Sequence, residues 1–459
     1  MTSVKRFTHR LLRKLQTRIS TTRVIAITFA LLILLGTVLL TLPIASRSGV
    51  SCGFRPALFT ATSATCVTGL VLYDTWSQWS GFGQTVILCL IEIGGLGFMS
   101  AASVVIFALR RKISLRQRML MAQALSLNEI NGVVRLQRWV IFGSLGIQAV
   151  GALILFLRFW PEFGPATALK WGVFHSVSAF CNAGFDILGS VAPGASTMVF
   201  QNDPVVLLTL TALIIIGGLG FLVWEDVAVN RRWKKLSVYT KLVLLTTAVL
   251  LAGGAILFTA LEWNNPNTFG TMTPAQKILN GWFQSVTVRT AGFASVDQAA
   301  LTDAGKGVSI FLMLIGGSSG STAGGVKTVT LMVLFLFLIT RARGKKTVTV
   351  FKRTIPDDKV MDAMTIVSIM VVLALFGGIF ICATSPVGFT DALFEVVSAL
   401  ATVGLTAGVT GSLSIPAQIL IIIYMYFGRV GVLTISLGFL MGNQAEERFR
   451  YAHTNLLIG

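Results

Sequence analysis

Long apolar segments recur along the chain, and their lengths restrict its fold more than any other feature of the sequence. A helix needs about 20 apolar residues to cross a hydrocarbon core about 30 Å thick. Eight stretches of this 459-residue chain meet that need, at 24–43, 84–109, 139–157, 205–224, 242–261, 308–315 with 326–340, 364–383 and 417–441. Shorter apolar pieces lie within each successive pair, at 56–67, 168–181, 275–288 and 389–401, and their length suits re-entrant segments. The pattern predicts an all-α integral membrane protein with eight transmembrane helices.

The charged residues are few and unevenly placed. Lys and Arg number 37 against 18 Asp and Glu, a formal net charge of +19. If the apolar segments alternate across a membrane, 28 of the 37 basic residues fall on one side and seven on the other. Basic residues gather on the cytoplasmic side of membrane proteins, so we expect both termini in the cytoplasm. The same distribution removes the main argument for a nucleic-acid-binding protein.

Residues suited to metal binding or covalent catalysis are scattered. The five cysteines form no C-x-x-C pair, the three histidines lie far apart, and Glu92 is the only acidic residue within a predicted span. Residues 320–328 resemble a phosphate-binding loop but are one residue too long and follow no predicted strand. We therefore expect no enzyme activity, no transition metal and no organic cofactor.

The strongest sign of internal organisation is a fourfold repeat. Each copy begins with Phe, passes through small and hydroxyl residues, and ends in Gly followed by Leu or Phe. The phenylalanines are Phe59, Phe174, Phe283 and Phe394, and the glycines are Gly69, Gly184, Gly292 and Gly404. A second element, GGLGF, follows at 94–98 and 217–221, and its counterparts read GGSSG at 316–320 and GRVG at 428–431.

Each copy thus contains a span, a re-entrant piece, a glycine loop and a second span. Two crossings return the chain to its starting side, so the four copies share one orientation. We predict that they surround one central pore with pseudo-fourfold symmetry. The alternative is a carrier with inverted repeats, which would need an odd number of crossings in each copy.

The glycine loops suit a cation filter made of backbone atoms. A short helix that enters from outside and stops at a glycine directs its partly negative C-terminal end to the axis. The carbonyl oxygens that follow can replace the hydration shell of a cation, and glycine permits the positive φ of a sharp turn. We expect Pro56 and Pro274 at first helical positions, with Thr273 or Thr390 as an N-cap.

Acidic residues follow three of the glycines on the predicted outer side, at Asp74, Asp186 and Asp297. We expect them to raise the local concentration of cations. For any one of them, an ordinary solvated loop acid is the alternative.

The second span of the third copy is interrupted. As one helix, residues 308–340 would be about 50 Å long at 1.5 Å per residue, well beyond the hydrocarbon core. Five glycines and three serines near its middle do not sustain a helix. We predict an intramembrane loop that blocks the pore below the filter, here named the gating segment: Gly316, Gly317, Ser318, Ser319, Gly320, Ser321, Thr322, Ala323, Gly324 and Gly325.

Two basic residues lie inside apolar segments. Arg429 follows Gly404 by 25 residues, the register of Gly317 after Gly292. A charge at membrane depth is costly and indicates function, so we expect Arg429 to gate the pore through loop carbonyls or as a positive barrier. A structural ion pair with Glu92 is the alternative. Lys327 is expected either to take part in gating or to extend its ammonium to the cytoplasmic boundary.

Together these features resemble the Trk/Ktr/HKT superfamily of potassium transporters. The four loops, the GGLGF elements and the sequence GGSSGSTAGGVKT carry the resemblance, which covers nearly the whole chain. Eight spans without an extra N-terminal helix pair look most like KtrB, the membrane subunit of bacterial Ktr systems. The resemblance implies sodium-stimulated potassium uptake across the bacterial inner membrane, a homodimer, and regulation by a cytosolic nucleotide-binding RCK ring similar to KtrA. Membrane lipids are further expected partners.

Carried over residue by residue, the resemblance implies a potassium filter, with sodium as a candidate second ion. The first two loops would contribute Cys66, Val67, Thr68, Gly69, Cys181, Asn182, Ala183 and Gly184. The last two would contribute Arg289, Thr290, Ala291, Gly292, Thr402, Val403 and Gly404. Only the fourth loop approaches the Thr-Val-Gly of potassium channels, so we expect fewer complete carbonyl rings than in a channel.

The repeat also sets the expected domain boundaries. They are a basic arm 1–23, pore repeats 24–110, 111–235, 236–345 and 346–442, and a cytoplasmic tail 443–459. The expected function is passive or sodium-coupled potassium uptake. A Trk-type symporter coupled to protons or sodium is the alternative, besides the inverted-repeat carrier.

Overall fold

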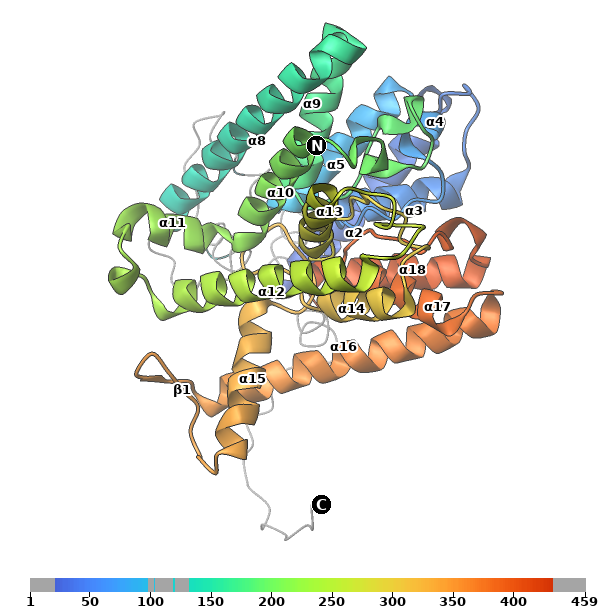
Figure 1. The fold of residues 1–459 in the computed structure, drawn as a ribbon. Coiled ribbons are helices and arrows are strands. Elements are labelled where there is room, and N and C mark those ends of the chain that lie inside the picture. The colour runs from blue at the N-terminus through green and yellow to red at the C-terminus, as the bar shows by residue number, and fades with distance from the viewer. Residues whose placement is uncertain (1–20, 98–102, 104–118, 120–131, 432–459) are drawn as a thin grey trace, which may run out of the picture.

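The computed structural model describes residues 21–97, 103, 119 and 132–431. The expectations for most of the basic arm, for the loop at 110–131 and for the tail 443–459 lie outside these residues. The described chain consists of helices and loops with one short hairpin, formed by β1 (Thr349–Val350) and β2 (Arg353–Thr354) (Figure 1).

The helices follow one another in four groups. The first contains α2 (Thr21–Thr41), α3 (Phe54–Thr65), α4 (Thr75–Gln78) and α5 (Gly81–Leu96). The second contains α8 (Val133–Phe163), α9 (Pro165–Phe180), α10 (Pro204–Leu219) and α11 (Phe221–Asn230). The third contains α12 (Val238–Glu262), α13 (Pro274–Thr287), α14 (Asp303–Leu314) and α15 (Thr328–Ala342). The fourth contains α16 (Asp357–Thr384), α17 (Phe389–Leu400) and α18 (Ile415–Val430). Short 3-10 turns are η1 (Pro43–Ala45), η2 (Leu188–Ser190), η3 (Ser196–Phe200), η4 (Trp233–Lys235) and η5 (Thr410–Ser412).

Among the described residues, four helices are long and apolar enough to cross a membrane, namely α2, α8, α12 and α16. The bent pair α10–α11 gives a fifth candidate, and α5, α15 and α18 are shorter apolar helices. Only about a third of the most apolar window of each long helix is buried, so the rest is free to face lipid. The expected all-helical, apolar character of the chain is confirmed.

One predicted span is wrong as a continuous helix. The segment 205–224 bends by 92° between α10 and α11. Gly220 lies at the bend with φ 94°, a conformation that glycine adopts without strain. The Phe221 N–H then donates to the carbonyl of Gly320 at 2.8 Å, so the bend is tied to the gating segment.

The helix starts agree with the sequence prediction in part. Thr273 caps α13 in a reciprocal capping box, with Pro274 as the first helical residue. Pro56, however, is the third residue of α3, which follows Gly53 as N-cap. Thr390 is the second residue of α17, which follows Gly388. These two expectations are wrong because a glycine occupies each N-cap, and its backbone makes the entry turn without a side-chain cap.

Four short helices form the centre of the molecule: α3, α9, α13 and α17. Their final eight residues are almost entirely buried, whereas α8, α12 and α16 lie toward the outside (Figure 1). One apolar cluster joins the first two groups through residues such as Leu40 and Phe159, and another joins the fourth group to the first and third through Phe59 and Phe394. The ends of the short helices are therefore held inside a continuous core.

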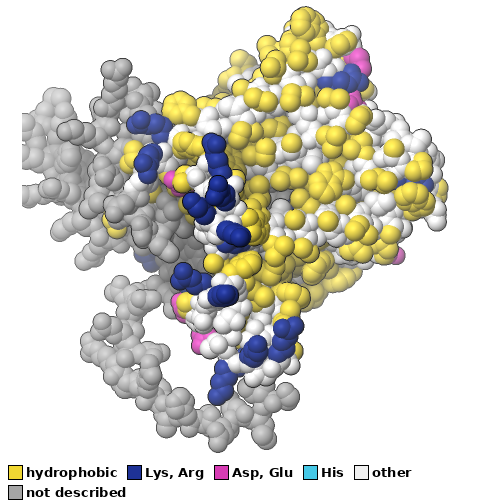
Figure 2. Space-filling view, turned by 60° about the vertical axis from the view of Figure 1, so that its left-hand side comes forward, with side chains coloured by type: hydrophobic (Ala, Val, Ile, Leu, Met, Phe, Trp, Pro, Cys, Tyr) yellow, Lys and Arg dark blue, Asp and Glu magenta, His cyan; other side chains and the backbone are white. Residues whose placement is uncertain are grey.

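Basic side chains gather at one end of the molecule. The loop between α11 and α12 exposes Arg231, Arg232, Lys234 and Lys235, and Lys241 lies over the Phe351 ring of the hairpin. Figure 2 shows the Lys and Arg side chains grouped beside a broad apolar surface. This arrangement is typical of a membrane protein with a basic face in water.

Candidate functional site

The four repeat glycines meet in a closed ring. A Cβ built on Gly184 would lie 2.7 Å from the Cα of Gly292, and one built on Gly292 would lie 3.3 Å from the Cα of Gly404. From Gly404 the corresponding distance to the Cα of Gly69 is 3.0 Å, and from Gly69 to the Cα of Gly184 it is 3.3 Å. Since no side chain fits between neighbouring loops, the ring requires glycine at all four positions.

A carbonyl oxygen from each loop points to the glycine of the next. The oxygens belong to Thr68, Ala183, Ala291 and Val403, each one residue before its own repeat glycine. The ring therefore carries four backbone oxygens around one axis. Oxygens in this arrangement can replace water around a cation.

The four loops also share an unusual backbone path. Each repeat glycine has positive φ, between 69° and 97°, and so does the residue two positions before it. Those residues are Val67, Asn182, Thr290 and Thr402, with φ between 53° and 68°. Left-handed backbone costs a non-glycine residue roughly 1–2 kcal/mol, so its occurrence at four matching positions indicates a shared geometric requirement.

Hydroxyl groups of the short helices hold the loops in this shape. The Gly69 N–H donates to Ser63 Oγ at 3.0 Å, and the Gly404 N–H donates to Ser398 Oγ at 3.1 Å. In the other two loops the hydroxyls of Ser178 and Thr287 donate to the carbonyls of Phe185 and Phe293 at 2.7 and 2.6 Å. Sequence reasoning did not assign these residues, although each copy has a hydroxyl five or six residues before its glycine.

Sequence reasoning also did not assign a second set of side chains that stabilise the loops. In three of the four copies, the residue after the repeat Phe forms hydrogen bonds to the segment that follows the glycine loop. His175 Nε2 accepts from the Ile187 N–H at 3.4 Å, and Gln284 donates to Gln298 at 2.6 Å. Glu395 accepts from the Thr406 hydroxyl, the Ala407 N–H and the Thr410 hydroxyl. Glu395 is fully buried, and both of its carboxyl oxygens have hydrogen-bond partners.

The ring opens on one side into an acidic cavity of about 280 Å³. All four glycines line it, together with the predicted acids Asp74, Asp186 and Asp297. Burial, with a smaller contribution from the carboxylate of Asp74, raises the pKa of Asp186 to about 6. The cavity therefore carries negative charge at neutral pH, and part of that charge is lost in mild acid.

The gating segment packs against the opposite side of the loops. The Thr322 hydroxyl donates to the carbonyl of Phe180 at 3.1 Å, and the Ser318 N–H donates to that of Gly218 at 3.0 Å. A Cβ on Gly324 would lie 2.8 Å from the carbonyl oxygen of Ala401. The segment thus lies against the ends of the short helices that lead into loops two and four.

The partly buried side chain of Arg429 bonds to the segment there. Arg429 donates to the carbonyls of Thr322 and Gly94, and to that of Gly95 at 2.9 Å. Its alternative partner Glu92 instead accepts from Gln148 at 3.0 Å and Cys181 at 3.3 Å. Arg429 thus bonds one carbonyl of the gating segment and two at the end of α5, and it forms no ion pair with Glu92.

Two further cations contact the gating segment. Lys327 donates to the carbonyl of Ala323 at 2.7 Å. Arg289, predicted as part of the third loop, is buried and directs its guanidinium to the carbonyl of Gly316 at 3.2 Å. Its side chain therefore lies on the gating side of the ring, while its neighbours Thr290 and Ala291 shape the ring itself.

The first glycine of the two GGLGF elements and of GRVG allows a helix to approach a short helix at its C-terminal end, whereas the counterpart in the third copy, Gly316, approaches Gly324 of the gating segment. A Cβ built on Gly94 would overlap the carbonyl oxygen of Thr65, one on Gly217 that of Phe180, and one on Gly428 that of Leu400. Any side chain would displace the helix from this carbonyl. The repeated motif is explained by this close approach.

Apolar helices long enough to cross a membrane, packed around converging loops, define the class: this is a multi-pass helical membrane protein. Residues 1–449 match the family described as TrkH, cation transport protein, and the chain belongs to that family.

Named relatives agree with the family. The chain is 41% identical to the potassium/sodium uptake protein NtpJ of Enterococcus hirae over 97% of this chain and 99% of the relative. It is 40% identical to the Ktr system potassium uptake protein B of Bacillus subtilis, over 94% of this chain and 96% of the relative. The crystal structure of the potassium transporter TrkH from Vibrio parahaemolyticus shares the fold, with a TM-score of 0.67 at 18% identity, covering 89% of this chain and 84% of that one.

Replacing Glu395 separates its charge from its hydrogen bonds. We expect Glu395→Gln to keep the loop folded, because the amide oxygen still accepts a hydrogen bond and the Thr410 hydroxyl can turn to accept one from the amide N–H. We expect cation binding to weaken, because a carboxylate attracts cations and an amide carries no charge. We expect Glu395→Ala to lower the free energy of unfolding by about 2–4 kcal/mol as well, since three donors lose their acceptor. Calorimetric titration with potassium and thermal unfolding measure the two effects. Equal cation affinity in the wild type and Glu395→Gln would contradict the electrostatic role.

Proposed function

We propose that this protein takes up potassium across the bacterial inner membrane through a pore lined by the four glycine loops. The single observation that carries the proposal is the closed ring of four glycines with one carbonyl oxygen at each junction. Two relatives whose names state potassium uptake support the cargo. Potassium, with sodium as a candidate second ion, is the transported substrate, and no reaction is catalysed.

The pore would consist of four span–loop–span repeats with eight crossings. Support comes from the order of helices in each group, in which a long apolar helix, a short buried helix and one or two further apolar helices follow one another. The proposed repeats keep the boundaries 24–110, 111–235, 236–345 and 346–442. Both termini would lie in the cytoplasm, because the described basic loops gather at one end (Figure 2).

The proposed filter consists of the residues that end each short helix. The carbonyls of Thr68, Ala183, Ala291 and Val403 would coordinate the ion, and the preceding left-handed residues would set their direction. Within the described loops, the contacts at the glycines define one ring of four carbonyl oxygens. Selectivity for potassium over sodium should therefore be lower than in a channel with several such rings.

The gating segment would close the pore from the cytoplasmic side. It is bonded through backbone carbonyls to Arg429, Lys327 and Arg289, so these cations would stabilise its blocking position. Opening then requires that several buried hydrogen bonds break together, which suits control by a regulator rather than spontaneous leakage.

Assembly and coupling follow from the resemblance and from the relatives. A homodimer and a cytosolic nucleotide-binding RCK ring are proposed, and the Ktr system name of one relative supports a partner subunit. The exposed basic side chains of the α11–α12 loop would face that ring or anionic lipid. Sodium stimulation, or symport with sodium, is supported by the name of NtpJ, while the shared orientation that an even number of crossings in each repeat predicts disfavours an inverted-repeat carrier.

Glycine substitutions test the filter. We expect Gly69→Ser and Gly292→Ser to reduce potassium uptake or potassium preference by about tenfold or more, because strain and steric overlap amount to more than about 1.4 kcal/mol. The matched control is Gly253→Ser, on α12, where a Cβ meets nothing within 4 Å. Complementation of uptake-deficient cells and flux into liposomes measure the effect. Unaltered uptake and ion preference in both loop variants would overturn the filter.

Freeing the gating segment tests the barrier. We expect Arg429→Gln, or deletion of residues 318–323, to raise potassium flux in liposomes without any regulator, because the blocking position loses its donors or its length. Arg341→Gln, an exposed basic residue at the end of α15, is the control and should leave basal flux unchanged. If basal flux stays low in both gating variants, the segment is not a barrier.

External pH tests the acidic cavity. Asp186 is charged above its pKa of about 6 and neutral below it, so apparent potassium affinity should fall as external pH drops from 7.5 to 5. One unit charge about 8 Å away in water contributes about 0.5 kcal/mol, or about twofold in affinity. Asp186→Asn should show the low-pH affinity at both values, whereas Asp297→Asn should keep the step. A step that persists in Asp186→Asn would assign it to another group.

A further inference from the structure

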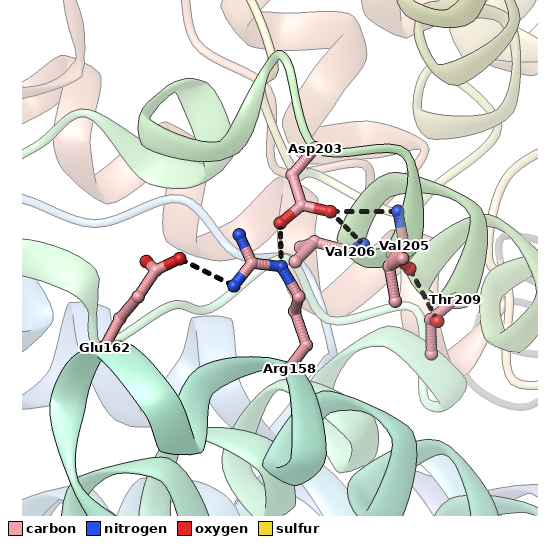
Figure 3. Close-up of polar contacts among 6 residues, drawn as sticks. All are labelled: Arg158, Glu162, Asp203, Val205, Val206 and Thr209. Carbon is pink, nitrogen blue, oxygen red and sulfur yellow. Dashed lines mark hydrogen bonds and ion pairs between the residues drawn. The ribbon is translucent and has the colours of Figure 1, made fainter.

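An apolar groove runs along the outside of the second helix group. It has a volume of about 590 Å³ and lies between α8 and α10, lined among others by Gly146, Val150, Ile154, Val205 and Leu208. The groove is apolar even at Thr209, whose hydroxyl donates back to the Val205 carbonyl at 2.7 Å (Figure 3). From Pro204 to Ile216 it extends about 18 Å at 1.5 Å per residue, close to one leaflet of a hydrocarbon core about 30 Å thick.

An ionic cluster stands at the end of the groove where α10 begins. Arg158 Nε bonds to Asp203 at 2.6 Å and its Nη1 to Glu162 at 2.6 Å. Asp203 also caps α10 by accepting the N–H groups of Val205 and Val206 (Figure 3). Within the described part of the chain, Nη2 of Arg158 and the second oxygen of Glu162 have no hydrogen-bond partner, and both side chains are partly exposed. The cluster thus offers one donor and one acceptor, with a net charge of −1.

We propose that this groove binds one phospholipid with a zwitterionic, primary-amine headgroup of the phosphatidylethanolamine class. One acyl chain lies between α8 and α10, the phosphate accepts from Arg158, and the ammonium donates to Glu162. Charge complementarity selects this headgroup, because an anionic lipid would meet two carboxylates for one guanidinium.

The dimensions favour an acyl chain over a helix of a second copy. A helix about 10 Å across and 18 Å long would occupy about 1,400 Å³, more than twice the volume of the groove. Within a bilayer an acyl chain gains no hydrophobic free energy by leaving its neighbours, since lipid tails are as apolar as leucine. The preference among lipids must therefore come from the headgroup contacts at Arg158 and Glu162.

Filling the groove tests the site. Gly146 lines the groove and a Cβ there meets nothing within 4 Å, so Gly146→Leu occupies the space without disturbing the helices. Gly253→Leu on α12 is the matched control, with equally open surroundings outside the groove. Native mass spectrometry of the full-length protein, delipidated and titrated with dioleoyl phosphatidylethanolamine or phosphatidylglycerol, counts the retained lipids. Thermal unfolding confirms that each variant is folded.

The wild type and Gly253→Leu should retain one tightly held phosphatidylethanolamine, with a preference of about fivefold or more over phosphatidylglycerol, and Gly146→Leu should lose it. Glu162→Gln should keep the lipid but lose the headgroup preference, since the amide still accepts a hydrogen bond but lacks the negative charge that attracts the ammonium and repels an anionic lipid. An unchanged lipid count in Gly146→Leu, or a preference for phosphatidylglycerol in the wild type, would overturn the proposal. A change of oligomeric mass in Gly146→Leu without loss of lipid would instead assign the groove to contact between copies.

Discussion

The rest of the structure depends on the close approach of four backbone segments around one axis. Neighbouring loops lie so near one another that even a methyl group would not fit between them. Each loop must therefore end in glycine, each short helix must deliver its last turn to the same point, and each surrounding helix must pack tightly enough to hold it there. The burial of the short helices and the small residues along them follow from this single requirement.

Backbone polar groups at membrane depth need partners, and here the chain itself supplies them. Hydroxyls of Ser63, Ser178, Thr287 and Ser398 bond each loop from behind. Below the ring, Arg429 bonds carbonyls from two different segments. Irregular backbone persists in an apolar surrounding because hydroxyls of the short helices and side chains of neighbouring segments bond to donors and acceptors of the loops.

The short apolar stretches allowed α3, α9, α13 and α17 to be located, and the repeated Phe-to-Gly spacing allowed the candidate loops to be predicted, because a period of about 110 residues is visible without any three-dimensional information. The composition of 316–325 likewise indicated an interruption between α14 and α15. The hydrogen-bond partners of residues far apart in the chain could not be predicted from the sequence. Glu92 and Arg429 have opposite charges and similar depth, yet Gln148, Cys181 and loop carbonyls are nearer to them. The bend at Gly220 was missed because apolar composition continues through it, and only the hydrogen bond from Phe221 to the gating segment reveals its purpose.

That bend has a mechanical consequence. The gating segment is bonded to Phe221 at the start of α11 and, through the carbonyl of Ser319, to the Tyr239 hydroxyl in the first turn of α12 at 3.0 Å. The basic loop at 231–237 joins these two helices, so one of its ends leads through the ten residues of α11 to the gating segment and the other reaches it at Tyr239, two residues on. A force applied to this surface loop would be transmitted to the gating segment through α11 and through Tyr239, without having to deform the long helices α8 and α16.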